Sequence, residues 1–209
     1  MYNLEELTAP ALRRLLDAGV VTAVVPFGSI EHQGGHLPIG ADAMLADAVG
    51  REVARVLDAV LAPTVRVGDA EPLAQLTGTM SVRAGTLCDL AVQLSESLIR
   101  QGFRLIVLVC AHGGNRRALD AAVARVRVSS SGAVVCAPPG DVGPRPGAHS
   151  GEWLTSVMLA LRPDVVELED AGSELAGELR AANLERGVRH IERFVSSIVA
   201  GARAAELPG

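Results

Sequence analysis

Lysine is absent from this chain, and all 19 of its basic residues are arginines. Without a lysine ε-amine the protein can form neither a Walker A phosphate-binding loop nor a Schiff base with pyridoxal phosphate or a carbonyl substrate. Positive charge is not concentrated either, because the net charge is −5 and adjacent basic residues occur only in pairs such as Arg13 and Arg14. We therefore expect no nucleic-acid partner.

Cysteine and long apolar runs are also scarce. The three cysteines are an odd number without metal-ligand spacing, so no disulfide framework is expected. The longest apolar runs, such as residues 105–111, are far shorter than the ~20 residues that cross a bilayer. The residues after Met1 are polar and acidic, unlike a secretory signal. These features predict a cytoplasmic protein without a membrane partner.

Hydrophobic residues make up 49% of the 209 residues, which is enough for a sizeable core in a single domain spanning residues 1–209. Short β-branched apolar runs alternate with longer segments whose apolar residues recur three and four positions apart. The short runs predict strands at 20–27, 61–67, 105–111 and 133–138. The longer segments predict helices at 4–18, 43–60, 85–101, 115–127, 150–161 and 183–205. This alternation predicts an α/β fold with a mostly parallel sheet covered on both faces.

The chemically distinctive residues follow the ends of predicted strands. Residues 28–42, 112–115 and 149–152 contain every histidine except His190, together with several carboxylates. In a parallel α/β sheet the carboxyl ends of the strands meet at one edge, where ligands bind. Imidazole and carboxylate groups that converge there predict a divalent-metal site. The candidate ligands are Glu31, His36, Asp42, His112 and Glu152.

Each candidate also has a purely structural explanation. Asp42 could cap the helix that follows it, and Glu31 could be an ordinary loop carboxylate. The glycines before Asn115 could form a tight turn with Asn115 as the helix N-cap, and Glu152 could be favoured by a helix dipole. His36 could be a hydrogen-bonded structural histidine. The metal hypothesis is preferred because all of these residues fall at the same predicted edge.

Four motifs follow one another in a characteristic order. Residues 31–42 read EHQGGHLPIGAD, residues 78–81 GTMS, residues 112–115 HGGN and residues 149–156 HSGEWLTS. Together they resemble the creatininase (creatinine amidohydrolase) family, over most of the chain. This resemblance implies a three-layer α/β/α sandwich and a metal-dependent, often homo-oligomeric amidohydrolase. Such an enzyme cleaves a C–N amide bond of a small substrate with metal-activated water.

The resemblance also implies roles for individual residues. Glu31, Asp42 and His112 match metal ligands, and Asp42 matches the ligand that bridges two ions. Family members with glycine at the position of Gly114 usually have glutamate at that of Glu152, so we expect Glu152 to supply a carboxylate from across the site, as ligand or base.

Two histidines complete the expected site. His149 matches a catalytic histidine and is expected to act as the acid–base that protonates the leaving nitrogen. His36 is kept as a further candidate ligand.

The chain departs from the family pattern at several positions. Gln33 stands where a histidine usually binds the second metal, and Leu154 replaces a usual glutamate. We therefore expect one tightly bound Zn²⁺ or Mn²⁺ and a weak or absent second ion. The departures do not support creatinine itself as the substrate.

Several functions stay open from the sequence. The preferred one is an amidohydrolase acting on a small, possibly cyclic amide. The alternatives are a peptidase of the kind that trims the mycofactocin precursor, and a non-catalytic relative that binds metal or ligand. A generic nucleotide binder is disfavoured because no Gly-x-Gly-x-x-Gly motif follows a predicted strand.

Overall fold

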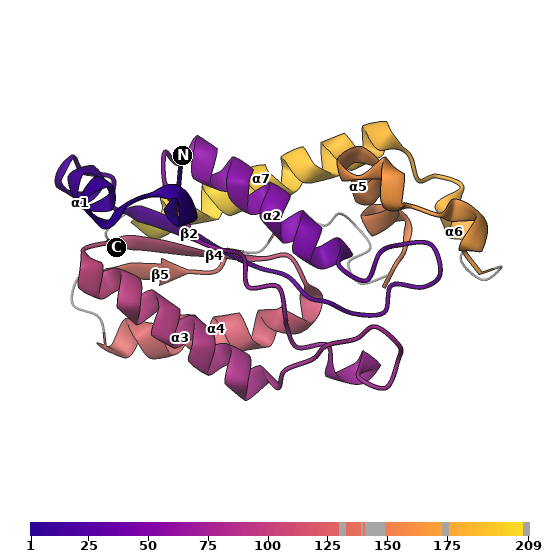
Figure 1. Cartoon of the computed structure of the whole chain (residues 1–209), viewed down its shortest axis with the longest axis horizontal. Coiled ribbons are helices and arrows are strands. Elements are labelled where there is room, and N and C mark those ends of the chain that lie inside the picture. The colour runs from indigo at the N-terminus through magenta and orange to yellow at the C-terminus, as the bar shows by residue number, and fades with distance from the viewer. Residues whose placement is uncertain (130–132, 139, 141–148, 173–175, 207–209) are drawn as a thin grey trace.

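A parallel five-stranded sheet forms the centre of the molecule in the computed structural model (Figure 1). The structure describes residues 1–129, 133–138, 140, 149–172 and 176–206. The strands are β1 (Tyr2–Asn3), β2 (Thr22–Phe27), β3 (Val60–Leu61), β4 (Leu105–Cys110) and β5 (Val134–Cys136). They lie in the order β1-β3-β2-β4-β5, and every adjacent pair is parallel. The predicted α/β fold is therefore confirmed.

Helices cover both faces of this sheet, which gives three layers (Figure 1). One face carries α2 (Ala41–Val56), α5 (Glu152–Leu161) and α7 (Leu184–Glu206). The other face carries α3 (Ala84–Gln101) and α4 (Arg116–Ser129). In the part of the chain that the structure describes, the remaining helices are α1 (Ala9–Asp17), the short α6 (Ala176–Leu179) and five single 3₁₀ turns, at Leu4–Glu6, Glu71–Leu73, Gly113–Asn115, Pro163–Val165 and Leu168–Asp170.

Two hydrophobic cores result, one on each side of the sheet. Successive strand residues point to opposite faces, so Val24 and Val107 enter the core beneath α2 and α7. Val25 and Leu108 enter the core beneath α3 and α4. Strands buried on both faces explain why the predicted strand sequences are continuously apolar rather than alternating.

Several predicted element boundaries are corrected by local backbone chemistry. The helix expected over 43–60 ends at Val56, because Asp58 adopts a left-handed conformation with φ of 48°. The strand expected over 61–67 forms a regular ladder only at Val60–Leu61, and farther along Val65 makes an isolated parallel bridge with Phe27. Pro63, which lies between them, has no N–H to donate to a ladder. The helix expected over 4–18 is a 3₁₀ turn followed by α1, whose N-terminus is capped by the Thr8 side chain.

Other boundaries agree with the sequence more closely. Gly102 ends α3 with φ of 112°, as its predicted position after the helix requires. Strand β1 and helix α6 were not predicted, because segments of two and four residues carry no periodic pattern. The sequence also favours a structured connection between residues 138 and 149, most of which lies outside the described residues.

The strand order changes direction between β2 and β4. From β2 the chain passes to β3 on one side, whereas from β4 it passes to β5 on the other. The carboxyl ends of the adjacent strands β2 and β4 therefore form the switch point at which open α/β sheets bind ligands.

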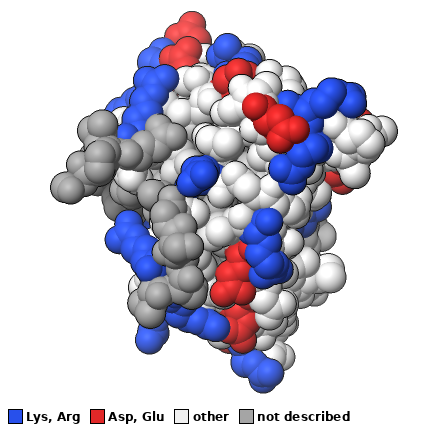
Figure 2. All heavy atoms as spheres, turned by 90° about the vertical axis from the view of Figure 1, so that its left-hand side faces the viewer, with Lys and Arg blue, Asp and Glu red and all other residues white. Residues whose placement is uncertain are grey.

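Two surface properties bear on partners. Within the described residues no helix has both the length and the apolar character that spanning a bilayer requires. Figure 2 shows that, among the described residues of the face it presents, arginine and acidic side chains lie interspersed rather than forming one basic surface.

Candidate metal centre

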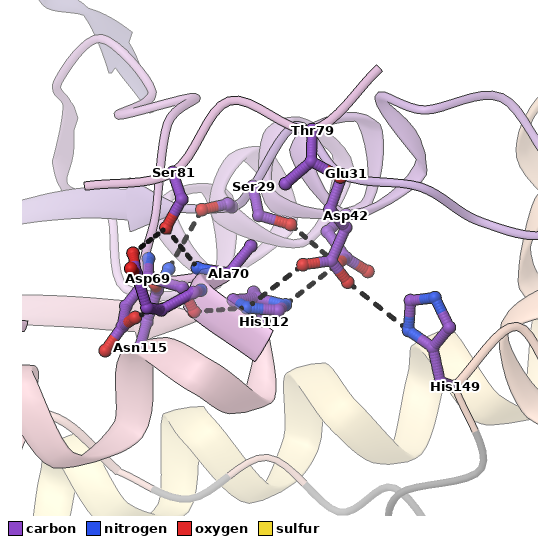
Figure 3. Close-up of polar contacts among 12 residues, drawn as sticks. Ser29, Glu31, Asp42, Asp69, Ala70, Thr79, Ser81, His112, Asn115 and His149 are labelled. Atoms are coloured by element: carbon purple, nitrogen blue, oxygen red, sulfur yellow. Dashed lines mark hydrogen bonds and ion pairs between the residues drawn. The ribbon is translucent and has the colours of Figure 1, made fainter. Parts of the chain in front are cut away.

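Glu31, Asp42 and His112 meet at the switch point (Figure 3). Glu31 lies in the loop after β2, Asp42 in the first turn of α2, and His112 two residues after β4. One potential ligand atom from each residue lies within 4.8 Å of the other two. Glu31 and Asp42 are only 1% and 6% exposed, so two carboxylates share a site that is almost closed to water.

Asp42 directs its carboxylate into this cluster rather than toward the helix backbone. Its Oδ2 accepts a hydrogen bond from Ser29 Oγ at 2.9 Å and lies 3.0 Å from His112 Nδ1. Gly40 occupies the N-cap position of α2 without a side-chain hydrogen bond. The capping explanation for Asp42 therefore does not hold.

The proton arrangement of His112 follows from its neighbours. Its Nε2 lies 3.0 Å from the carbonyl oxygen of Asp69, which can only accept, so Nε2 carries a proton. Nδ1 then faces Asp42 Oδ2 and is the nitrogen free to ligate a metal. A histidine ligand whose other ring N–H donates to a backbone carbonyl is a common arrangement at metal sites.

Asn115 fixes the backbone that holds His112. Its Oδ1 accepts from the Asp69 amide and its Nδ2 donates to the Gly28 carbonyl, both at 2.9 Å. Asn115 is fully buried in these bonds and joins the loop containing Asp69 to the end of β2. The side chain of Asn115 therefore bridges these two segments instead of capping the helix that follows.

The electrostatics of the cluster favour a positive charge between the carboxylates. Burial raises the pKa of Glu31 to about 7, and the negative charge of Asp42 adds to this shift while His112 opposes it. Burial alone would lower the pKa of His112, but the hydrogen bond to Asp42 and the charges of Asp42 and Glu31 outweigh it and raise the pKa. Without a metal, protons therefore supply the positive charge that the two carboxylates need.

The residues present fit a divalent cation. Among the described residues, none donates a hydrogen bond to the buried Oε2 of Glu31, which lies 3.3 Å from His112 Nε2. Two carboxylates and one imidazole form a donor set suited to Zn²⁺ or Mn²⁺, and three protein ligands leave a coordination position open.

His149 lies beside the cluster, on the far side of the carboxylates from His112 (Figure 3). Its Nδ1 is 3.4 Å from Glu31 Oε1, and its Nε2 donates to the His32 carbonyl at 2.6 Å. The side chain is 40% exposed, so it is accessible from solvent as well as close to the cluster.

The structure does not bring Glu152 or His36 into the cluster. Both carboxylate oxygens of Glu152 accept from Arg186, and Oε1 also accepts from Ser156 Oγ at 2.7 Å. His36 is buried with its Nε2 3.0 Å from Thr155 Oγ1. Neither residue is therefore grouped with Glu31, Asp42 and His112: both carboxylate oxygens of Glu152 are hydrogen-bonded elsewhere, and Nε2 of His36 faces Thr155 while its buried Nδ1 has no hydrogen-bond partner among the described residues.

Several contacts within the site were not predicted from the sequence. Gln33 lies inside the cluster as a hydrogen-bond donor, and Ser29 orients Asp42. The ring of His112 is oriented by a backbone carbonyl, for which no side-chain pattern exists. Close packing requires glycine at position 114, because a Cβ on Gly114 would overlap the Asp69 carbonyl and crowd the His112 ring.

The fold and the cluster define a three-layer α/β protein with a candidate metal centre at the switch point of its sheet. Residues 5–205 match the family model described as creatininase, creatinine amidohydrolase. The chain belongs to the creatininase family, and the resemblance noted in its motifs is confirmed.

Curated relatives carry two different names. The chain is 37% identical over 161 residues to the mycofactocin precursor peptide peptidase of Mycolicibacterium smegmatis, covering 73% of this chain and 63% of that protein. It is 27% identical over 190 residues to the creatinine amidohydrolase of Pseudomonas putida, covering 78% and 73%. The chain thus spans about three fifths of the length of the mycobacterial relatives it matches, which include proteins covered to 59% and 61%.

Solved creatininase structures share the fold. A tryptophan-to-alanine mutant of creatininase aligns with a TM-score of 0.80 at 24% identity, covering 99% of each chain. A structure described as creatininase Mn aligns with a TM-score of 0.78 at 23% identity, covering 99% of each chain. A glutamate-to-glutamine mutant described as Zn-Zn type also gives 0.78 at 23% identity, covering 99% of this chain and 98% of that one.

Proposed function

We propose that this chain is a metal-dependent hydrolase that cleaves the C–N bond of an amide. The observation that carries the proposal is the buried cluster of Glu31, Asp42 and His112, with His149 at its side. A bound Zn²⁺ or Mn²⁺ would polarise an amide carbonyl and lower the pKa of water at this site. The metals named for related creatininase structures, Mn and Zn, agree with the donor set found here.

Each residue of the site has a distinct task. Glu31 and Asp42 supply the negative charge that holds the ion, and His112 presents Nδ1 because Nε2–H is bonded to Asp69. The Nε2–H of His149 is bonded to the His32 carbonyl, so His149 exchanges protons at Nδ1. His149 therefore receives a proton at Nδ1 and delivers it to the leaving nitrogen.

A small amide is the substrate class that the space beside the cluster favours. A cavity of about 260 Å³ adjoins His112 and is lined by apolar side chains including Leu45, Trp153 and Phe194, with Arg116 as a polar contributor. This volume lies at or below the range typical of pockets for drug-sized ligands. The pocket supports a compact substrate with an apolar part.

A peptide amide is the second candidate substrate. The observation that favours it is the identity of 37% to a mycofactocin precursor peptide peptidase, against 27% to a creatinine amidohydrolase. A peptide bond is also an amide C–N bond, so the same residues would perform the same proton transfers.

Release of amine from a substrate panel tests the proposal. The purified chain, supplied with Mn²⁺ or Zn²⁺, is incubated with small cyclic amides, linear amides and short peptides. We expect turnover that a chelator abolishes and that Asp42→Asn abolishes. Asp47→Asn is the matched control, because Asp47 lies on the same helix in an exposed pair with Arg66. Metal binding without turnover on any amide would overturn catalysis and favour a non-catalytic relative.

The location, oligomeric state and domain organisation of the protein are also proposals. We infer a cytoplasmic homo-oligomer built from a single domain spanning residues 1–209. Support comes from the resemblance to the family and from the continuous sheet that runs through the described residues. Light scattering coupled to gel filtration tests the oligomeric state.

A further inference from the structure

The side-chain amide of Gln33 lies between the two carboxylates of the cluster. Its Nε2 is 3.2 Å from Glu31 Oε1 and 3.2 Å from Asp42 Oδ2, and it donates to both. Gln33 is 1% exposed, so neither of these hydrogen bonds competes with bulk water. The two amide hydrogens are therefore both used to join Glu31 to Asp42.

The orientation of this amide is fixed from its other end. Ser150 Oγ donates to Gln33 Oε1 at 2.9 Å, which leaves Nε2, and not Oε1, facing the carboxylates. Ser150 is itself held in a left-handed conformation with φ of 57° and is 2% exposed. If the amide were flipped, its oxygen would face the two carboxylate oxygens and its nitrogen would face Ser150 Oγ. The Ser150 hydroxyl would then have no oxygen of Gln33 to which it could donate.

The amide substitutes for positive charge at this point of the cluster. An N–H₂ group carries partial positive charge and stabilises two nearby carboxylates, but it does not ligate a metal because the nitrogen lone pair is delocalised into the amide carbonyl. The two oxygens that face Gln33 are Glu31 Oε1 and Asp42 Oδ2, and both accept from its Nε2. Asp42 Oδ2 also accepts from Ser29 Oγ and faces His112 Nδ1. By contrast, Glu31 Oε2 accepts no hydrogen bond from any described residue.

We infer that Gln33 occupies the place of a second cation between Glu31 and Asp42, that it limits the centre to one ion, and that it positions both carboxylates around that ion. This inference rests on the proposed metal-dependent function and deepens it. Gln33 acts through the two carboxylates and is therefore a positioning residue.

Metal stoichiometry tests the inference without a substrate. Wild-type protein, Gln33→His and Gln33→Glu are stripped of metal, titrated with MnCl₂ or ZnSO₄ by calorimetry, and analysed for metal per chain after dialysis. We expect about one ion in wild type and about two in Gln33→His, with the second ion held at least ~10-fold tighter than any second ion in wild type. Gln93→His, on the exposed part of α3, controls for the added imidazole.

Gln33→Glu keeps the shape of the side chain and provides an independent readout. It replaces the two donors by a third carboxylate, so the metal-free variant should have a lower melting temperature than wild type, and added metal should raise that temperature more than in wild type. Circular dichroism checks that each variant is folded.

The outcomes separate this inference from the proposed function. Two ions that survive dialysis in wild type would overturn the role of Gln33 and leave the metal-dependent function standing. One ion in wild type and in both folded variants would also overturn the role of Gln33 alone. No bound ion in wild type would overturn both.

Discussion

Arg186 donates hydrogen bonds to both carboxylate oxygens of Glu152, with Nε 2.7 Å from Oε1 and Nη2 3.2 Å from Oε2. The pair joins the first turn of α5 to the first turn of α7, and Ser156 Oγ donates to the same carboxylate. Burial opposes ionisation of Glu152, but the hydrogen bonds from Arg186 and Ser156 and the charge of Arg186 outweigh it and hold the pKa below its ordinary value. The negative charge of this carboxylate is therefore already balanced within the fold by the guanidinium of Arg186.

The first prediction follows from that pair. Glu152→Gln should leave the metal content unchanged and lower the free energy of unfolding by about 1–2 kcal/mol at neutral pH, because charged hydrogen bonds are lost. Since the folded pKa is depressed, the contribution is present above the ordinary pKa of 4.5 and is lost as the pH falls through the folded value. Denaturant unfolding at several pH values measures this difference.

Glu185→Gln is the control for that experiment. Glu185 pairs with Arg189 on the surface of α7, and its side chain is 83% exposed, so its replacement should have little effect on stability. A fall in metal content of Glu152→Gln would return Glu152 to the ligand role that the family motifs imply.

The second prediction concerns pH and the metal-free cluster. Glu31, with a pKa of about 7, and His112, with a raised pKa, both bind protons more tightly in the folded than in the unfolded chain. The stabilising contribution of each group is therefore present at low pH and is lost as the pH rises through its folded pKa. The melting temperature of chelator-treated protein should decrease for this reason as the pH rises from about 5 to about 8.

Metal binding should have the opposite dependence on pH. The ion competes with the protons of the cluster, so its affinity should rise about 10-fold per pH unit for each proton displaced. Calorimetric titration at a series of pH values measures the slope, and Glu31→Gln should reduce it along with the affinity. A metal affinity independent of pH over this range would contradict the assignment of protons to Glu31 and His112.

The third prediction concerns two neighbouring glycines. A Cβ at Gly114 would overlap the Asp69 carbonyl and crowd the His112 ring, whereas a Cβ at Gly113 would meet nothing within 4 Å. Gly114→Ala should cost about 1–3 kcal/mol of stability and weaken metal binding, because the Asp69–His112 hydrogen bond is displaced. Gly113→Ala, the matched control, should keep both properties. Equal metal affinity in the two variants would show that the Asp69 carbonyl does not orient His112.

Much of the fold could be predicted because burial leaves a periodic mark on the sequence. The helices α3 and α7 are long enough to show it, and the strands β2 and β4, buried on both faces, show continuous apolar runs instead. The errors lie where one residue decides the backbone, as at Asp58 and Pro63, whose effects appear only after the flanking elements are placed.

In the candidate site, likewise, some residues could be predicted from the sequence and some contacts could not. Glu31, Asp42 and His112 could be grouped from the sequence because all three lie in the segments that follow the carboxyl ends of β2 and β4. The partners of Glu152 could not, since Arg186 lies on a helix whose rotation about its axis is set by packing on α5. The orientation of the Gln33 amide likewise depends on Ser150, which reaches it from a distant segment.

The last prediction assigns different tasks to His149 and His32. His149 presents Nδ1 to Glu31 Oε1 at 3.4 Å, while the bond from Nε2 to the His32 carbonyl fixes the ring. His149 is not among the three grouped ligands, so His149→Ala should retain the wild-type metal content and lose roughly 10²–10⁴-fold in kcat. Added imidazole should restore part of the lost rate, since the space vacated by the partly exposed ring is open to solvent.

His32→Ala is the matched variant for this experiment. It removes a neighbouring imidazole but keeps the backbone carbonyl that accepts from His149, so metal content and kcat should both stay near wild type. Metal analysis beside kcat and KM, on whichever amide of the panel is cleaved, measures both variants. Full activity in metal-loaded His149→Ala would remove the catalytic role of His149. Loss of metal from His32→Ala would instead mean that the loop after β2 binds the ion through His32, in a register different from the one in which Gln33 lies between the carboxylates.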